Sequence, residues 1–302
     1  MLNFIFTFFV LISLFVGNAA LSIFLGIFFA YYFKISKIFF SRQVGTIPLQ
    51  IGILILGATI SVPYALDVSS EYLPWISLFV IVSFFAGLIL GRILGVHHRV
   101  AFLISSGAAI CGGTAMAAVA PIIKAKPQEL LIAMTIVFLL NAVAIILFPI
   151  IGGYLEMSNF EFGAWSALVV HDTSSVIGSA LIYSNESAQV AATLKLGRTI
   201  WLIPLIFIAN LIFNRQTKVT RFPIFILFFI AAIFTNTILN LNDEIIYFLQ
   251  MLSQAFLIFG LFCIGSQFDT NEIKSITSKP LIMAVSIWVL VIPSAYILVK
   301  YF

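Results

Sequence analysis

Two pairs of ionisable side chains lie inside apolar segments of this chain, where a charge is costly unless it is partnered or functional. Lys195 and Arg198 are three residues apart, so they share one face of a helix. With no acid in their own segment, they need a carboxylate from elsewhere or an anionic ligand. The alternative is that they lie near the membrane surface and reach water.

His171 and Asp172 are adjacent, so on one helix they point about 100° apart and need separate partners. Lys195 or Arg198 is an obvious partner for Asp172. His171 is either a satisfied core histidine or a group that titrates between about pH 5 and 8 and couples protons. We therefore assign His171 and Asp172 to proton coupling, and Lys195 and Arg198 to substrate binding.

Glycines interrupt the apolar sequence SSGAAICGGTAMAAVAPIIKAK at residues 105–126. Glycine weakens a helix interior by about 0.5–1 kcal/mol relative to alanine, so a helix that only fills lipid would avoid them. A helix broken in mid-membrane would use them, and substrate is one way to satisfy the freed backbone groups. The alternative is a small-residue face for close helix packing. We predict a break between Ala108 and Thr114, where the expected substrate ligands are Ala109, Ile110, Cys111, Gly112, Gly113 and Thr114.

The composition is that of a membrane protein. Of 302 residues, 62% are hydrophobic and 9% are charged, whereas a soluble domain is about half apolar and a quarter charged. Cys111 and Cys263 both lie in apolar segments, which argues against a disulfide framework or a zinc site. The net charge of +4 comes from short basic loops and does not indicate nucleic-acid binding. The N-terminus has no basic n-region and is interpreted as mature sequence.

Apolar runs predict about eleven transmembrane helices, or about ten if residues 2–16 and 19–33 form one tilted helix; two spans are preferred. The positive-inside rule makes the side with most basic residues cytoplasmic in an inner or plasma membrane. That side is expected to hold Lys34, Lys37, Arg42, Arg92, Arg99, Arg215, Lys218, Arg221, Lys274 and Lys279. Lys124 and Lys126 are expected to end the broken helix at the external side.

Short matches at half the chain length predict an internal repeat, with chance similarity as the alternative. LQIG at 49–52 parallels LKLG at 194–197, and FLI occurs at 102–104 and 256–258. Five spans in each half would give the halves opposite orientations, as in secondary transporters. We predict one transmembrane domain, 1–302, with a first repeat at 17–151 and a second at 162–302. On this plan a second broken helix near 260–266 adds Gly265 and Ser266 to the substrate site.

Several motifs follow one another in the order seen in a known transporter family. They are AICG at 109–112 followed by AAVAPIIKA at 117–125, the His171-Asp172 pair, KLGR at 195–198 and QIGI at 50–53. Together they resemble the YeiH-like sulfate exporter family, with departures at Gly113, Thr114, Ser175 and Thr59. The resemblance implies an all-α polytopic protein related to cation/proton antiporters and bile-acid symporters, with two inverted five-helix repeats and crossed discontinuous helices.

The expected function is secondary transport of a small anion, such as sulfate, another sulfur oxyanion or an organosulfonate, by alternating access. The alternatives are a sodium- or proton-coupled symporter of organic acids, an intramembrane enzyme with Cys111 as nucleophile and His171 as base, and a structural subunit. We expect no enzymatic activity and no cofactor other than a coupling ion, H⁺ or Na⁺. The expected partners are the small anionic substrate and the lipid bilayer, without nucleic acid, and a homodimer is left open.

Overall fold

The computed structural model describes residues 2–33, 40–44, 47–213, 224–266 and 277–301, and their regular structure is helical. Five described helical segments are long and apolar enough to cross a membrane, and shorter apolar helices accompany them. The five are Tyr72–Ile93, Gln128–Tyr154, Asn185–Phe213, Glu244–Ser266 and Ser278–Tyr301. Outside the described residues lie Lys34, Lys37, Arg215, Lys218, Arg221, Lys274 and the side chain of Arg42, all from the predicted cytoplasmic set. The chain divides into two compact units.

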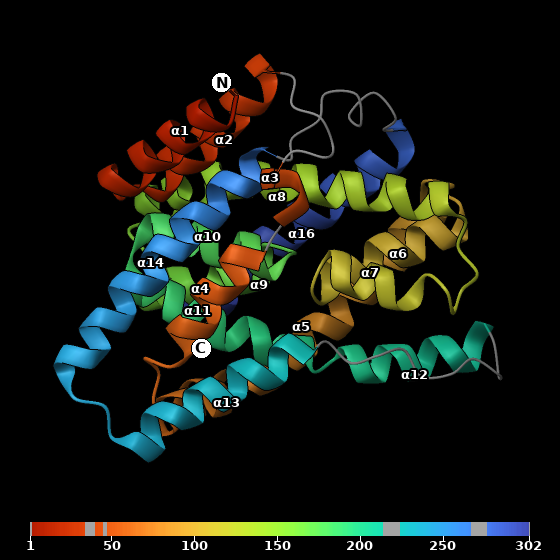
Figure 1. Ribbon diagram of the computed structural model, residues 1–302. Helices are drawn as coiled ribbons and strands as arrows, with labels where there is room; N and C mark the ends of the chain where they lie inside the picture. Colours follow the sequence, from red (N-terminus) through yellow and green to blue (C-terminus); the bar gives the residue numbers. More distant parts are fainter. Residues whose placement is uncertain (1, 34–39, 45–46, 214–223, 267–276, 302) are drawn as a thin grey trace. The chain divides into compact units, whose positions relative to one another are not determined.

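The first unit combines Met1–Leu66 with Ile224–Asn271. Its helices are α1 (Leu2–Val16), α2 (Ala19–Phe33), α3 (Phe40–Val44), α4 (Ile47–Gly57), α13 (Ile224–Leu239) and α14 (Asp243–Ser266). The first two apolar runs are separate helices, as predicted, and Gly17 turns the chain between them with a φ of +66°. α14 packs along α2 and α4 (Figure 1). The rings of Phe6, Phe29 and Phe262 pack together where α1, α2 and α14 meet.

α14 is one continuous helix, so the predicted break near residues 260–266 is wrong. The glycines there serve close packing instead. A Cβ at Gly260 would lie 2.4 Å from the Cβ of Leu49, and one at Gly265 would lie 2.3 Å from the carbonyl oxygen of Ile23. Both glycines therefore let a neighbouring helix approach α14 at backbone distance, which is the small-residue packing that was the alternative reading for such a segment.

The second unit combines Asp67–Pro223 with Glu272–Phe302. Its helices are α5 (Val62–Ile93, which begins in the first unit), α6 (His98–Ala109), α7 (Gly113–Val119), α8 (Pro127–Tyr154), α9 (Asn159–Val169), α10 (Thr173–Tyr183), α11 (Asn185–Thr199), α12 (Leu202–Phe213) and α16 (Ser278–Tyr301). Local signals fix several helix starts. Ser158 and Glu161 form a capping box at α9, and the Ser184 side chain accepts from the Ser187 N–H at α11.

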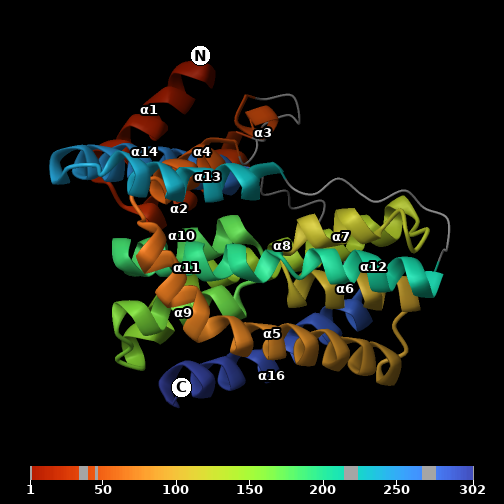
Figure 2. The same ribbon diagram turned by 90° about the horizontal axis from the view of Figure 1, so that it is seen from below.

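α6 and α7 form a helical hairpin, which we call hairpin A (Figure 2). The chain reverses at residues 110–112, and a Cβ at Gly107 on α6 would lie 3.2 Å from Met116 on α7. The two ends of the hairpin also meet. Glu129, in the first turn of α8, places one carboxylate oxygen 3.1 Å from His97 Nδ1, and its other oxygen accepts from the Lys126 N–H at 2.7 Å. The two chain ends of hairpin A, at His97 and Lys126, therefore lie side by side.

α9 and α10 form a second hairpin, hairpin B, which reverses at residues 170–172. Its two ends are joined by side chains. The rings of Phe162 and Tyr183 stack with centroids 4.1 Å apart, and the Tyr183 hydroxyl donates to the Met157 carbonyl oxygen. Asn159 Nδ2 donates to Glu186 at 3.0 Å. Hairpin B therefore consists of two short antiparallel helices.

The bases of the two hairpins lie at opposite ends of α8. Hairpin A closes at Lys126, where α8 begins, and a Cβ at Gly152 near its other end would lie 2.4 Å from the ring of Phe162 in hairpin B. A helix of 28 residues is about 42 Å long, enough to cross the hydrocarbon core of about 30 Å. Lys124 and Lys126 thus lie at the same end of α8 as His97, which corrects their predicted placement on the opposite side.

Candidate functional site

The tips of hairpins A and B meet in the second unit. At the tip of hairpin A, Gly112 adopts φ +60° and ψ −123°, a conformation that residues with a Cβ rarely adopt. A Cβ at Gly112 would lie 3.1 Å from the Cβ of Asp172 and 3.2 Å from its Cα, at the tip of hairpin B. The glycine therefore serves both the reversal of the chain and the close approach of the tips. The predicted break between Ala108 and Thr114 is confirmed.

The carbonyl end of α6 is closed by Arg198 from α11. Ser106 and Gly107 accept backbone hydrogen bonds from residues 110 and 112. The last two carbonyls receive the guanidinium: Nε donates to the Ala109 oxygen and Nη2 to the Ala108 oxygen, each at 2.6 Å. The carbonyls of residues 107–109 are among those that a helix end leaves without an intrahelical partner, and all three accept hydrogen bonds within the protein.

The carbonyl end of α9 is closed in the same way by three side chains. Arg198, Lys195 and Trp288 donate to the four carbonyls of residues 167–170. Arg198 Nη1 donates to Ala167 at 3.0 Å and to Leu168 at 2.6 Å, Trp288 Nε1 to Val169 at 3.1 Å, and Lys195 Nζ to Val170 at 2.6 Å. A helix C-terminus carries partial negative charge, so two buried cations complement the two carbonyl ends.

Asp172 lies at the amide end of α10 as its N-cap. Its Oδ2 accepts from the N–H of Ser175 at 3.2 Å and lies 3.3 Å from the Ser175 hydroxyl. No ion pair joins Asp172 to Lys195 or Arg198 within the described part of the chain, so the predicted pairing gives way to capping. Asp172 and Thr173 are half-buried, whereas both cations are fully buried. The amide end of α10 is thus more accessible than the carbonyl ends.

His171 is buried at the tip of hairpin B. Its backbone N–H donates to Asn141 Oδ1 at 3.2 Å, which ties the tip to the middle of α8, and its ring lies 5.8 Å from that of Trp288. Among the described residues, His171 Nδ1 and Asn141 Nδ2 are buried without a hydrogen-bond partner. Nothing in the sequence singled out Trp288. A polar amide in the middle of an apolar span was the available signal for Asn141.

The structure brings together most of the residues predicted for the site. Residues 109–114, His171, Asp172, Lys195 and Arg198 all belong to hairpins A and B or to α11. Ile110 and Cys111 are buried, while Thr114 is exposed. Gly265 and Ser266 belong to the first unit, where Ser266 Oγ lies 2.7 Å from Ser41 Oγ. The described residues contain no group of three or more His, Cys, Asp or Glu side chains able to hold a metal ion.

Glu161, at the base of hairpin B, has a perturbed pKa. The pKa of Glu161 lies below its usual value because its carboxylate accepts the N–H of Ser158 and faces Lys300 Nζ at 3.0 Å. Lys300 belongs to the last turn of α16, so this pair joins α16 to the start of α9. The base of hairpin B is therefore held by a charge pair as well as by stacked rings.

Long apolar helices, together with two helical hairpins that meet tip to tip, define a multi-pass membrane protein. The chain belongs to the UPF0324 membrane protein family. The family model described as Conserved hypothetical protein 698 matches residues 7–284.

Three relatives are similar to this chain over most of its length. The UPF0324 membrane protein of Bacteroides thetaiotaomicron is 35% identical over 272 residues, covering 89% of this chain and 82% of the relative. UPF0324 membrane protein VP0936 of Vibrio parahaemolyticus is 36% identical over 248 residues, with 80% of each chain covered. The UPF0324 membrane protein of Porphyromonas gingivalis is 40% identical over 222 residues, covering 71% and 67%. No solved structure matches the chain.

Proposed function

We propose that the protein is a secondary transporter that carries a small anion and uses the meeting point of the hairpin tips as its substrate site. The observation that carries this proposal is a difference between the two kinds of helix end at the hairpin tips: side chains close the carbonyl ends, whereas the amide end of α10 is more accessible. The carbonyl ends of α6 and α9 are closed by Arg198, Lys195 and Trp288. The first amides of α10 have no carbonyl partner in their own helix, and the positive end of that helix dipole favours an anion.

The depth of the site supports transport. The tip of hairpin B is bonded to Asn141, which lies near the middle of α8, so the site is about as far from one base as from the other. Re-entrant backbone at this depth is tolerated in a membrane where it lines a cavity or is buried in protein. A binding site halfway across, reached from either side in turn, is what alternating access requires.

Asp172 supplies a means of proton coupling. Its carboxylate already occupies the amide end of α10, through its bonds to Ser175. A bound anion would meet that negative charge, and two like charges in one buried site are unfavourable. Protonation of Asp172 removes the repulsion while an acid group can still cap the helix. Anion binding and proton binding therefore favour each other, and the anion would move together with a proton.

The choice of anion rests on the resemblance of the 109–125, 171–172 and 195–198 motifs to the YeiH-like sulfate exporters. We propose sulfate or another small sulfur oxyanion or organosulfonate. Ala109, Cys111 and Gly113 are small residues, so the backbone amides beside them can approach a compact oxyanion closely. The second candidate is a proton-coupled symporter of organic acids, which the position of Asp172 supports equally.

Uptake into proteoliposomes tests the proposal. Purified full-length protein would be given radiolabelled sulfate, sulfite, taurine or succinate under an imposed pH gradient, with protein-free vesicles as the blank. We expect uptake of a sulfur anion that rises with the gradient and is unchanged by a sodium gradient. Uptake of succinate alone would select the organic-acid symporter. No gradient-dependent uptake of any of the four would overturn secondary anion transport at this site.

A further inference from the structure

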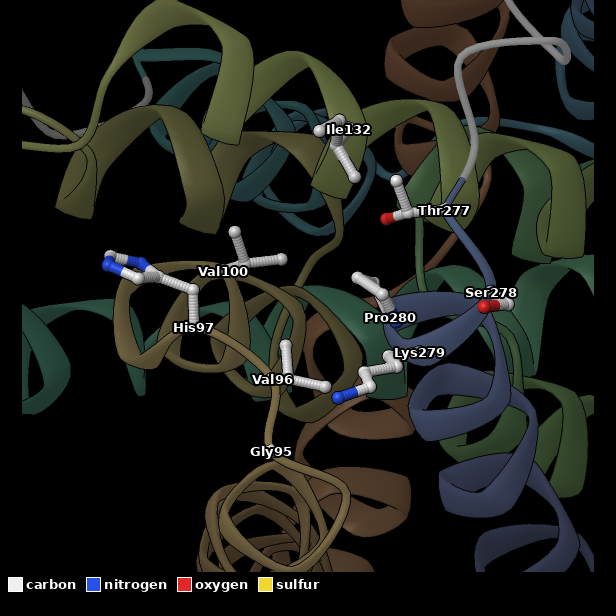
Figure 3. Close-up of a pocket in the computed structure, with 9 residues that line it drawn as sticks. All are labelled: Gly95, Val96, His97, Val100, Ile132, Thr277, Ser278, Lys279 and Pro280. Carbon is white, nitrogen blue, oxygen red and sulfur yellow. The ribbon is translucent and has the colours of Figure 1, made fainter.

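A cavity of about 410 Å³ lies beside the base of hairpin A, away from the hairpin tips. It is formed by the end of α5, the start of α6, one turn of α8 and the start of α16 (Figure 3). The lining residues are Gly95, Val96, His97, Val100, Ile132, Thr277, Ser278, Lys279 and Pro280. Its volume falls in the range of about 300–1,000 Å³ that holds small ligands.

The lining of this cavity is amphipathic. Val100, Ile132 and Pro280 face one another across the hollow, and the Lys279 amine reaches over its mouth toward Gly95 (Figure 3). A Cβ at Gly95 would lie 3.6 Å from Lys279 Nζ, at ordinary van der Waals distance, so the amine lies directly beside Gly95. The cavity therefore offers an apolar interior and a cation at its opening.

The charge at the opening is unbalanced. Lys279 is exposed, and no carboxylate of the described residues lies within ion-pair distance of it. The nearby acid, Glu129, is already engaged by His97 Nδ1 at 3.1 Å, Arg99 Nη1 at 3.8 Å and the Lys126 N–H at 2.7 Å. Among the described residues, a ligand at this opening would thus meet the unpaired cation of Lys279.

The cavity also lies at the level where two membrane spans end. The apolar span of α5 ends at Ile93, whose side chain is 73% exposed, and that of α16 begins at Ser278. Lipid headgroups occupy this level, with acyl chains directly below. An amphiphile gains from both the cation and the apolar interior, whereas a free anion gains only from the cation.

We propose that this cavity binds one anionic phospholipid, with the phosphate at Lys279 and the upper part of an acyl chain against Val100, Ile132 and Pro280. The lipid would brace the first arm of hairpin A and the start of α8 against α16. Basic residues gather at this end of α8, which suits the anionic leaflet of the cytoplasmic side. The proposal does not depend on which solute the protein carries.

Native mass spectrometry of the full-length protein tests it, with phosphatidylglycerol and phosphatidylcholine of identical chains offered together. We expect about one phosphatidylglycerol retained per chain in preference to phosphatidylcholine. Lys279→Gln should lower its affinity about fivefold, the usual contribution of one lysine near a membrane surface. Lys124→Gln, an exposed lysine at the same end of α8 that does not line the cavity, should leave retention unchanged.

A second variant separates the cavity from surface charge. Ile132→Trp fills the interior of the cavity and leaves Lys279 in place, so it should abolish retention of phosphatidylglycerol. Lys279→Arg keeps the positive charge and should retain the lipid. If Lys279→Gln fails to fold, these two variants test the proposal in its place. Equal retention of the two lipids, or equal losses in Lys279→Gln and Lys124→Gln, would overturn the proposal. So would displacement of the lipid by millimolar inorganic phosphate or glycerol 3-phosphate, because the site would then recognise a free anion.

Discussion

Replacing Arg198 by methionine should open the hairpin tips, because this one side chain joins both of them. The guanidinium donates four hydrogen bonds to carbonyls of α6 and α9. A hydrogen bond from a charged donor contributes about 1.5–3 kcal/mol, which would give a sum of about 6–12 kcal/mol. That sum is too high, because methionine avoids the desolvation cost of a buried cation and water can reach some released carbonyls. Breaking a buried charged network costs about 3–5 kcal/mol, so we take about 4 kcal/mol.

The chain contains its own reporter for this opening. Cys111 lies at the tip of hairpin A and is 1% exposed, so a maleimide reaches it only when the tip opens. The other cysteine, Cys263, would be replaced by alanine in every variant. If opening and closing are faster than labelling, the rate follows the open population, and about 4 kcal/mol corresponds to roughly a thousandfold increase.

Two further variants make the measurement decisive. Arg198→Lys keeps the charge but loses the planar fork that reaches four carbonyls, so its labelling rate should fall between those of wild type and Arg198→Met. Arg92→Met removes an exposed arginine of the same unit and should label at the wild-type rate. A labelling rate for Arg198→Met within a few-fold of wild type, in folded and monodisperse protein, would refute the view that Arg198 holds the tips closed.

Three other predictions concern the tips and the base of hairpin B. Gly112→Ala should lower the free energy of unfolding by about 1–3 kcal/mol, because the added Cβ is strained at φ +60° and meets Asp172. As the control, Gly153→Ala has open space around its Cβ and should not lower the thermal unfolding midpoint. Asp172→Asn keeps an N-cap residue, so its melting midpoint should stay near wild type while proteoliposome uptake loses its dependence on the pH gradient. Glu161 has a lowered pKa because it accepts a backbone N–H and faces Lys300, so its contribution is present above its unfolded pKa of about 4.3 and is lost as pH falls through the folded value. Glu161→Gln should therefore flatten the pH dependence of the melting midpoint below about pH 5. At pH 7 it should lower the free energy of unfolding by less than about 1 kcal/mol.

The break in hairpin A could be predicted from the sequence because its cause is local. A residue that must adopt φ +60° beside another backbone is nearly always glycine, and Gly112 lies within the predicted interval. Lys195 and Arg198 could be recognised as charges inside an apolar run that need partners, with contact to water as the alternative, and the structure buries both. What they bind could not be recognised, since the carbonyls of residues 108–109 and 167–170 carry no side-chain signal.

The hairpin form of the two broken segments could not be read from length. Twenty apolar residues suit one span or two short helices that return to the same side, and the difference lies in contacts far apart in sequence. His97 meets Glu129 at one base, and Phe162 meets Tyr183 at the other. Glycine in an apolar segment can likewise indicate either a helix break or close helix packing. In α14, Gly260 allows close packing and the helix continues past it.

The positions of the charges explain why the two buried cations need not touch the substrate. Lys195 and Arg198 face helix ends of partial negative charge, and their donors are directed at carbonyl oxygens. On the proposed anion transport, removing either cation would leave uncapped carbonyls whose dipoles repel an anion bound nearby. The cations would then act on selectivity by closing the carbonyl ends, and the proposed anion would bind at the amide end of α10. Among the described residues, Asp172 is the carboxylate at that end, and in this proposal its protonation decides whether an anion binds.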